Sequence, residues 1–504
     1  MKKAGLYFAF ALLAFNTFAS AQEINSEENT PNELLVETLS LSYGAPVEIY
    51  IDENRCQVDY SAVEIKEIEN QATETAEPAQ KNETNAEPKT IITPIDKTTA
   101  YCSKIGDFNG LPQYKLTNTS INKLLAQIYN HFSIPLVKNI TAESFSEEQT
   151  IVPQLGLISS ERMALNKAVY TENDEESGLK KESGNLQKLI IKKDIIQQGQ
   201  NVKYLTDLQL NKLNILFPMF ALRLNSEHQA TEVVYADSAE NPFDYTNLWQ
   251  NLAAFVSSRS RAVINGVSLK SDFLGFGLSY DMELKSQAQV KPDGILDSTG
   301  IIEVNHLSFT GDMLEKHQQP QSIIIKSELN NLKLQNISQL GKVQQEFMED
   351  ESSEIDEEKL IAILDEILDT SSIITDIKVN FAQAHIYAHF DFYRKNNFLQ
   401  GEGNIKINNL FNIFPEFKKC AQNSNAPECA QNAVYQELVP YIDLSKNISV
   451  NKLKYTEQGI FLNNKKIAEP VEIDLHKIIQ DSADDKESDD SLNETDESSA
   501  ENEI

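Results

Sequence analysis

The chain of 504 residues carries 44 Lys and Arg against 76 Asp and Glu, which gives a formal charge of −32 at pH 7. So acidic a chain repels DNA, RNA and anionic lipid head groups at long range, and this excludes nucleic acid as a partner. The length suits two or three domains, or one elongated sheet protein.

The N-terminal residues predict a secretory signal peptide over residues 1–21. Two lysines follow Met1, an apolar run extends from Leu6 to Phe15, and Ala19-Ser20-Ala21 forms a small-residue cleavage site. The apolar run is too short to span a bilayer, and no later stretch approaches the roughly twenty apolar residues of a membrane helix, so we expect no integral membrane segment in the mature chain. The sequence therefore predicts export to the periplasm, with cleavage after Ala21.

Residues 22–112 predict a small β unit, with alternating strands at 47–51 and 56–60. A stretch rich in Glu, Thr, Ala, Asn and Pro interrupts it at about 66–97, and we expect this insertion to be disordered because it cannot bury enough apolar surface. Four cysteines in an exported chain predict two disulfides, and no Cys-x-x-Cys spacing suggests metal binding. The simplest of three connectivities joins neighbours in sequence, as Cys56–Cys102 and Cys420–Cys429.

Residues 113–345 predict helices followed by antiparallel sheet. Apolar residues at helical spacing indicate a helix over 121–132, a short helix over 160–170 and a third helix over 242–257. The strand signal grows from residue 186 and dominates from residue 262 onward. The clearest strand is 274–284, where one parity is apolar throughout: Leu274, Phe276, Leu278, Tyr280, Met282 and Leu284.

Residues 346–475 predict a second β-rich part that includes the Cys420–Cys429 loop, and residues 476–504 predict a disordered acidic tail. An amphipathic helix is expected at 360–369, and a last hairpin at 448–462. The resulting fold class is α+β, with long antiparallel β meanders and a few covering amphipathic helices. The covering helices are those at 121–132, 242–257 and 360–369.

Catalytic motifs are missing from the sequence, so we predict no catalytic residue, no metal and no cofactor. No nucleophile elbow, phosphate-binding glycine loop or His-Glu-x-x-His is present. His385, Tyr387, His389 and Asp391 share one face of a strand, which leaves a metal-dependent enzyme as an alternative. However, i and i+4 positions on a strand lie roughly 13 Å apart, too far for both imidazoles to bind one ion unless the strand bends.

The apolar face of the 274–284 strand is the candidate binding surface. It is either an ordinary core closed by the amphipathic helices, or a partly open trough for acyl chains or a partner helix. We expect a non-catalytic protein that binds a lipid or an envelope protein, with Leu274 to Leu284 as contact residues. A purely structural scaffold with a closed core is the alternative.

Three strand-turn-strand units carry a resemblance to known proteins. They are Val267–Leu284, Phe390–Ile407 and Leu453–Lys465. They resemble the repeated units of YdgA-like and AsmA-like bacterial envelope proteins over residues 186–470. The YdgA-like group closes with a dG-x-L-x-x-N-G hairpin, and here Asn464 stands where that glycine would be. The leader here is of the cleavable type, whereas those families keep an anchor. The resemblance implies an envelope role with lipid handling and transfers no catalytic residue.

Overall fold

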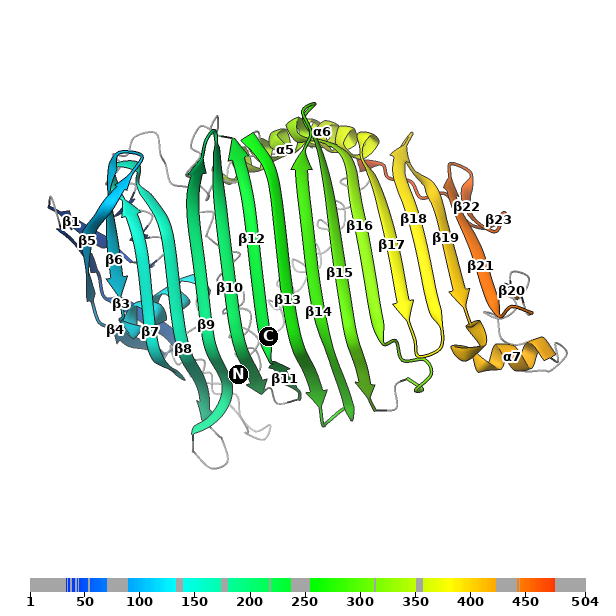
Figure 1. Ribbon diagram of the computed structural model, residues 1–504, viewed down its shortest axis with the longest axis horizontal. Coiled ribbons are helices and arrows are strands. Elements are labelled where there is room, and N and C mark those ends of the chain that lie inside the picture. The colour runs from blue at the N-terminus through cyan, green and yellow to red at the C-terminus, as the bar shows by residue number, and fades with distance from the viewer. Residues whose placement is uncertain are drawn as a thin grey trace, which may run out of the picture. The chain divides into compact units, whose positions relative to one another are not determined.

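A computed structural model (Figure 1) describes most of the chain. The described residues are 45–52, 55–69, 89–132, 139–173, 180–216, 219–236, 254–311, 314–349, 357–422, 442–443 and 445–475, with residues 33, 35, 36, 39, 40 and 43 before them. The chain divides into two units. Unit 1 comprises residues 1–248, 260–282 and 309–313, and unit 2 comprises 249–259, 283–308 and 314–504.

The described residues form a β-rich fold, so the predicted α+β class is wrong. Strands make up 67% of them and helices 15%, and 21 strands belong to one sheet. The error lies in the covering helices, which are too few and too short to form a layer over so many strands. Helix 121–132 is present, and 360–369 lies within a longer helix, but 255–257 begin a strand.

Unit 1 is an antiparallel sheet in which neighbours in sequence are mostly neighbours in space. Hydrogen bonding follows the order β1–β2–β5–β6–β7–β8–β9–β10, and β10 then pairs with both β11 and β12. The strands are β1 (Val47–Ile51), β2 (Arg55–Tyr60), β5 (Thr98–Phe108), β6 (Leu111–Asn118), β7 (Ile140–Val152), β8 (Leu157–Asn173), β9 (Lys180–Gln198), β10 (Asn201–Leu216), β11 (Ala221–Leu224) and β12 (Ser226–Ala236).

The short helix predicted over 160–170 is wrong, because these residues lie within β8. Met163 and Leu165 are buried on one parity, and the strand pairs with β7 on one side and β9 on the other. Met, Ala, Leu and Lys are good helix formers, but two ladders of hydrogen bonds override that local preference.

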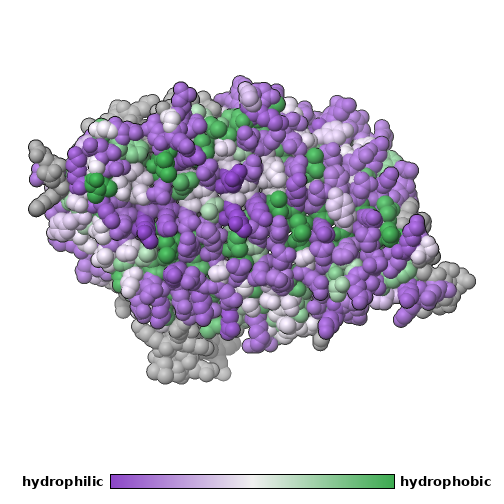
Figure 2. All heavy atoms as spheres, viewed as in Figure 1, coloured by the Kyte–Doolittle hydropathy of each residue, from purple (hydrophilic) through white to green (hydrophobic). Residues whose placement is uncertain are grey.

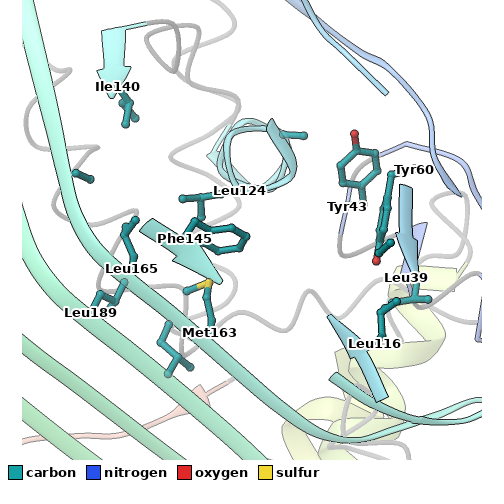
Figure 3. Close-up of a cluster of buried hydrophobic side chains, with 14 of the residues drawn as sticks. Leu39, Tyr43, Tyr60, Leu116, Leu124, Ile140, Phe145, Met163, Leu165 and Leu189 are labelled. Atoms are coloured by element: carbon teal, nitrogen blue, oxygen red, sulfur yellow. The ribbon is translucent and has the colours of Figure 1, made fainter. Parts of the chain in front are cut away.

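Helix α3 (Ile121–Phe132) has the predicted bounds, but it packs on the strands of unit 1, where its buried face closes the main core, and not on the 274–284 strand. Figure 3 shows Leu124 of the helix close to Phe145 of β7, with Met163 and Leu165 of β8 nearby. Tyr43 and Tyr60 meet edge to face, with ring centres 5.0 Å apart.

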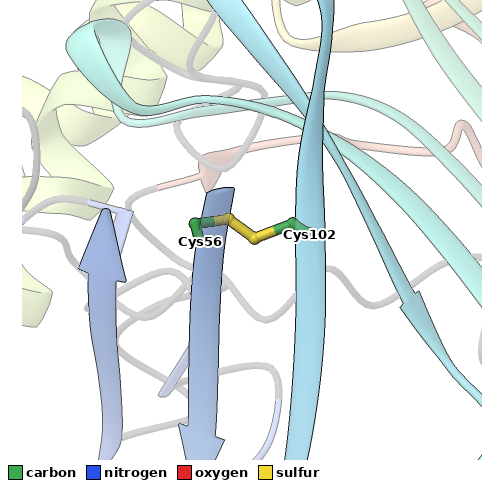
Figure 4. Close-up of a disulfide and its surroundings, with 2 residues drawn as sticks. All are labelled: Cys56 and Cys102. Atoms are coloured by element: carbon green, nitrogen blue, oxygen red, sulfur yellow. A yellow bond between two sulfur atoms is a disulfide. The ribbon is translucent and has the colours of Figure 1, made fainter. Parts of the chain in front are cut away.

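The predicted Cys56–Cys102 disulfide is confirmed (Figure 4). The two residues are directly opposed on β2 and β5, with Cα atoms 4.8 Å apart. Within the insertion predicted to be disordered, β3 (Val63–Glu69) pairs with β4 (Lys89–Ile95), so its ends are strands. Residues 70–88 lie outside the described residues.

Unit 2 holds a second series of antiparallel neighbours, in the order β15–β16–β17–β18–β19–β21–β22–β23. Strands β13 (Phe255–Ser271), β14 (Phe276–Val290) and β15 (Ile295–Thr310) each contribute residues to both units. The remaining strands are β16 (Ser322–Lys333), β17 (Ser372–Asn380), β18 (His385–Lys395), β19 (Phe398–Asn408), β20 (Ile442–Asp443), β21 (Ile448–Thr456), β22 (Gly459–Leu462) and β23 (Lys465–Ala468).

The described residues of unit 2 include three α-helices: α5 (Leu334–Glu349), α6 (Glu357–Thr370) and α7 (Pro415–Gln422). The sequence predicts α6, and it predicts a helical piece at 410–417 that corresponds to the 3₁₀ turn η4 (Leu410–Asn412) and the start of α7. It misses α5. The predicted hairpin over 448–462 is confirmed as β21 and β22.

Several predictions fall outside the described residues. They concern the signal peptide at 1–21, most of the helix at 242–257, Cys429 and the acidic tail at 476–504. Cys420 is disulfide-bonded, in agreement with the prediction that it forms a disulfide.

Candidate functional site

The residues predicted to form the binding face lie on β14 and in the turn before it. Phe276, Leu278, Tyr280, Met282 and Leu284 share one parity of β14 and are all half-buried, whereas Leu274 lies in the turn and is 67% exposed. Leu284 lies on the opposite side from its neighbour Lys285, whose Nζ is 3.5 Å from Glu303 of β15. Leu284 therefore faces the same way as Ile302, the residue before Glu303.

The register of unit 2 brings five apolar residues from five strands into one line. Ile302 pairs with Ile325, Ile325 with Ile377, Ile377 with Ala388, and Ala388 with Ile405. Directly opposed residues point to the same side of a sheet, and neighbouring strands are about 4.8 Å apart. These five residues, which we call the apolar row, therefore form a continuous apolar line roughly 19 Å long across the strands.

Helices cover the two ends of this face and leave the row between them (Figure 1). At one end, Arg394 of β18 is 5% exposed and its Nη1 lies 2.8 Å from Asp365 and 3.2 Å from Asp369 of α6. At the other end, a small buried core joins η4 and α7 to the sheet. It contains Phe381, Ala384, Ile407, Leu410, Ile413, Phe417, Cys420 and Ile442.

The apolar row is not buried to the degree of a closed core. Ile302 is 38% exposed, and Ile325, Ile377 and Ile405 are half-buried, so that only Ala388 is a buried residue of the row. In the core of unit 1, by contrast, Leu189 and Leu208 are 2% and 1% exposed. Leaving large aliphatic side chains partly in water forfeits part of the hydrophobic free energy, so the row is a surface suited to an apolar partner.

Aromatic rings border the row on the side towards α6. Phe390 and Phe392 of β18 stack with ring centres 5.6 Å apart, and Phe392 meets Tyr455 of β21 edge to face at 5.0 Å. Their partners across the ladder are Gly403 and Gly401 of β19, so the rings lie over bare backbone. We call the rings of Phe390, Phe392 and Tyr455 the aromatic shoulder of the row.

The opposite face of the same strands is polar and holds a hollow of about 680 Å³. Asp376 Oδ1 accepts hydrogen bonds from Tyr387 Oη at 2.7 Å and from His389 Nδ1 at 2.8 Å. The hydrogen bonds from Tyr387 and His389 lower the pKa of Asp376, and the bond to Asp376 raises the pKa of Tyr387. The hollow is lined by His389, Asp391, Tyr393, Gln400, Glu402 and Lys454, among others.

The two histidines of the metal-enzyme alternative do not meet. His385 Nδ1 lies 3.0 Å from Asn380 Oδ1, whereas His389 is bonded to Asp376. Across the described ranges, no group of three or more His, Cys, Asp or Glu is placed to hold a metal ion. The two imidazoles are therefore held as separate polar groups of a sheet face.

A buried ion pair in unit 1 is a feature that the sequence reasoning missed. Lys123 of α3 and Glu147 of β7 are 1% and 2% exposed and are bonded to each other. Burial lowers the pKa of Lys123, but Glu147 and Tyr60 together raise it above its ordinary value, while burial raises the pKa of Glu147. Lys123 Nζ also lies 4.6 Å from the ring centre of Tyr60. The sequence contains a hint of this pair, because Glu147 lies two residues after Phe145 and therefore on the same, buried face of the strand.

No protein-family model, curated protein or solved structure matches the chain. In the part of the chain that the structure describes, no helix combines the length and apolar character needed to cross a bilayer.

Proposed function

We propose that this protein binds an apolar, chain-like ligand, such as the acyl chain of a lipid, along the apolar row of unit 2. The observation that carries the proposal is the partial exposure of Ile302, Ile325, Ile377 and Ile405 in one unbroken line between two helix-covered ends. An ordinary core of this composition would be covered, as the core of unit 1 is.

The shape of the row supports an extended hydrocarbon chain as the ligand. The row runs across the strands for roughly 19 Å and contains no charged or polar side chain. The aromatic shoulder of Phe390, Phe392 and Tyr455 borders it on one side, and the α7 core borders it on the other. A second apolar line, formed by Val304, Ile323, Val379, Ile386 and Ile407, lies beside the row on the same face. The apolar surface is therefore longer than it is wide, which suits an extended hydrocarbon chain.

The proposal is one of binding without catalysis. The polar hollow on the other face offers carboxylates and His389, but His389 is bonded to Asp376 of β17. The resemblance to YdgA-like and AsmA-like envelope proteins implies the same kind of role.

We place the protein in the bacterial periplasm as part of this proposal. The Cys56–Cys102 disulfide supports an oxidising compartment, because such bonds are rare in the cytosol. The predicted leader over residues 1–21 agrees with export.

Lipid extraction and mass spectrometry of the purified protein test the proposal. We expect a lipid or fatty acid at close to one mole per mole of wild-type protein. Ile377→Glu places a charge in the middle of the row and should abolish recovery, because burying an unpaired carboxylate against a hydrocarbon chain is costly. Ile374→Glu is the matched control: it lies on the same strand but on the polar face, opposite Asp391.

Recovery of no lipid from the wild-type protein, or equal recovery from both variants, would count against the proposal. It would favour a purely structural scaffold or an envelope-protein partner instead.

A further inference from the structure

Two consecutive apolar residues protrude from the turn between β13 and β14. Phe273 is 76% exposed and Leu274 is 67% exposed, which makes them, with Tyr101, the most exposed large apolar side chains among the described residues. Met219, just before β11, is 49% exposed and is tied to the same turn. All three belong to unit 1, and we call them the apolar tip.

The hydroxyl group of Ser271 holds the tip together. Ser271 Oγ donates a hydrogen bond to the Met219 carbonyl at 2.6 Å and accepts one from the Leu274 amide at 3.2 Å. Ser271 is itself 5% exposed. Ser271 therefore satisfies the Met219 carbonyl and the Leu274 amide, and such pairing lowers the cost of moving a segment into an apolar medium.

On the face shown in Figure 2, hydrophilic residues predominate and hydrophobic residues form small separate groups. Single exposed apolar residues are ordinary in any protein, but three joined residues at the end of a hairpin are not.

The size and shape of the tip favour a bilayer over a protein partner. A stable protein interface buries about 800 Å² on each side, and three side chains on a convex turn cannot supply that area. A bilayer needs no complementary pocket, because its acyl chains rearrange around a short apolar protrusion.

The charges next to the tip favour zwitterionic lipid. Lys270 and Asp272, just before Phe273, form an exposed ion pair at 2.7 Å, so their charges cancel at the level of the head groups. The chain as a whole carries −32 and would be repelled by an anionic surface.

We propose that Phe273, Leu274 and Met219 insert into the head-group region of a zwitterionic phospholipid bilayer and hold the protein reversibly at its surface. This goes beyond the proposed acyl-chain binding and stands on a different part of the molecule. It would give a lipid-binding protein access to the bilayer in which such ligands reside.

Flotation with phosphatidylcholine vesicles tests the proposal on the full chain. We expect wild-type protein to float with the vesicles at low and high salt alike, since the lipid surface carries no net charge and the Lys270 and Asp272 charges beside the tip cancel. The double variant Phe273→Asp with Leu274→Asp should partition at least about tenfold less, because it exchanges apolar side chains for charges. Tyr101→Asp is the control: Tyr101 is 69% exposed in unit 1 but lies in β5, away from the turn. Failure of wild-type protein to float, or equal flotation of the double variant, would overturn the proposal.

A spectroscopic measurement gives a second, independent readout. Phe273→Trp should shift its emission to shorter wavelength when vesicles are added, and Tyr101→Trp should not. An unshifted Phe273→Trp would overturn the insertion. The double Asp variant should keep its bound lipid in the extraction experiment, so failure of the tip and failure of the apolar row can be told apart.

Discussion

Gly403 of β19 lies directly beneath the ring of Phe390 of β18, so close that a β-carbon at Gly403 would come within 2.7 Å of the ring. The next glycine along, Gly401, has a φ of +150°, and a β-carbon there would lie 2.0 Å from the Asp391 carbonyl oxygen and 3.0 Å from the Phe392 ring. Bare backbone at these positions lets the rings lie flat and form the aromatic shoulder of the apolar row.

Replacing Gly403 by Ala should therefore displace the Phe390 ring and lower the free energy of unfolding by about 1–3 kcal/mol. Gly300→Ala is the matched control, since Gly300 lies on the same side of the sheet in β15 and a β-carbon there has open space around it. The urea-unfolding midpoints of both variants check this. Equal midpoints would show that the ring does not depend on the missing side chain.

The buried pair in unit 1 predicts an asymmetry between single and double substitutions. Lys123→Met leaves the Glu147 carboxylate buried without its cation and should cost roughly 3–5 kcal/mol of unfolding free energy. Lys123→Met combined with Glu147→Leu removes both charges and should recover most of that loss. Denaturant unfolding measures both, and a double variant less stable than the single one would contradict this reading.

The same pair predicts a loss of stability at alkaline pH. The pKa of Lys123 is raised above its ordinary value of 10.5 in the folded protein. The pair therefore contributes its full stabilisation of the folded state below pH 10.5, and this contribution decreases as the pH rises further. Burial raises the pKa of Tyr43 to about 12, which acts in the same direction above pH 10.0. Urea midpoints measured between about pH 9 and 12 should fall for the wild-type protein and fall less for the double variant. A flat wild-type profile would exclude this linkage.

The disulfide should stabilise unit 1. Cys56 and Cys102 close a loop with a sequence separation of 46, for which loop-closure entropy gives about 4 kcal/mol. Cys56→Ser with Cys102→Ser should lower the thermal midpoint while leaving lipid recovery unchanged, because the apolar row lies in unit 2. Loss of bound lipid in this variant would mean that unit 1 takes part in binding.

The sequence predicts those elements whose signals are local. The helix at 121–132 follows from apolar spacing, the hairpin at 448–462 from its turn residues, and Cys56–Cys102 from pairing neighbours in sequence. The segment 160–170 was misjudged because its residues favour a helix while its hydrogen-bond partners in β7 and β9 are remote in sequence. The sequence gives no apolar stripe for helix α5, because the buried Leu334 and Val343 lie on opposite sides of the helix and the polar Asn336 and Ser338 are buried as well.

The candidate site could not be predicted from alternation alone. The sequence identifies an apolar parity in Ile302, Ile325 and Ile377, but a shift of one residue in any strand would turn its side chains to the opposite face. Only the observed register aligns them into one row. The apolar pair Phe273-Leu274 can be seen in the sequence, but its exposure cannot be predicted. It depends on β14 beginning at Phe276, which leaves Leu274 in the turn instead of in the strand.

Photo-crosslinking with a diazirine-bearing fatty acid tests the central claim most directly, because it reports where an acyl chain lies. After irradiation and proteolysis, we expect the label on peptides containing Ile302, Ile325, Ile377 or Ile405, with its yield reduced by Ile377→Glu and unchanged by Ile374→Glu. Label confined to other parts of the chain, or absent at saturating fatty acid, would contradict the account.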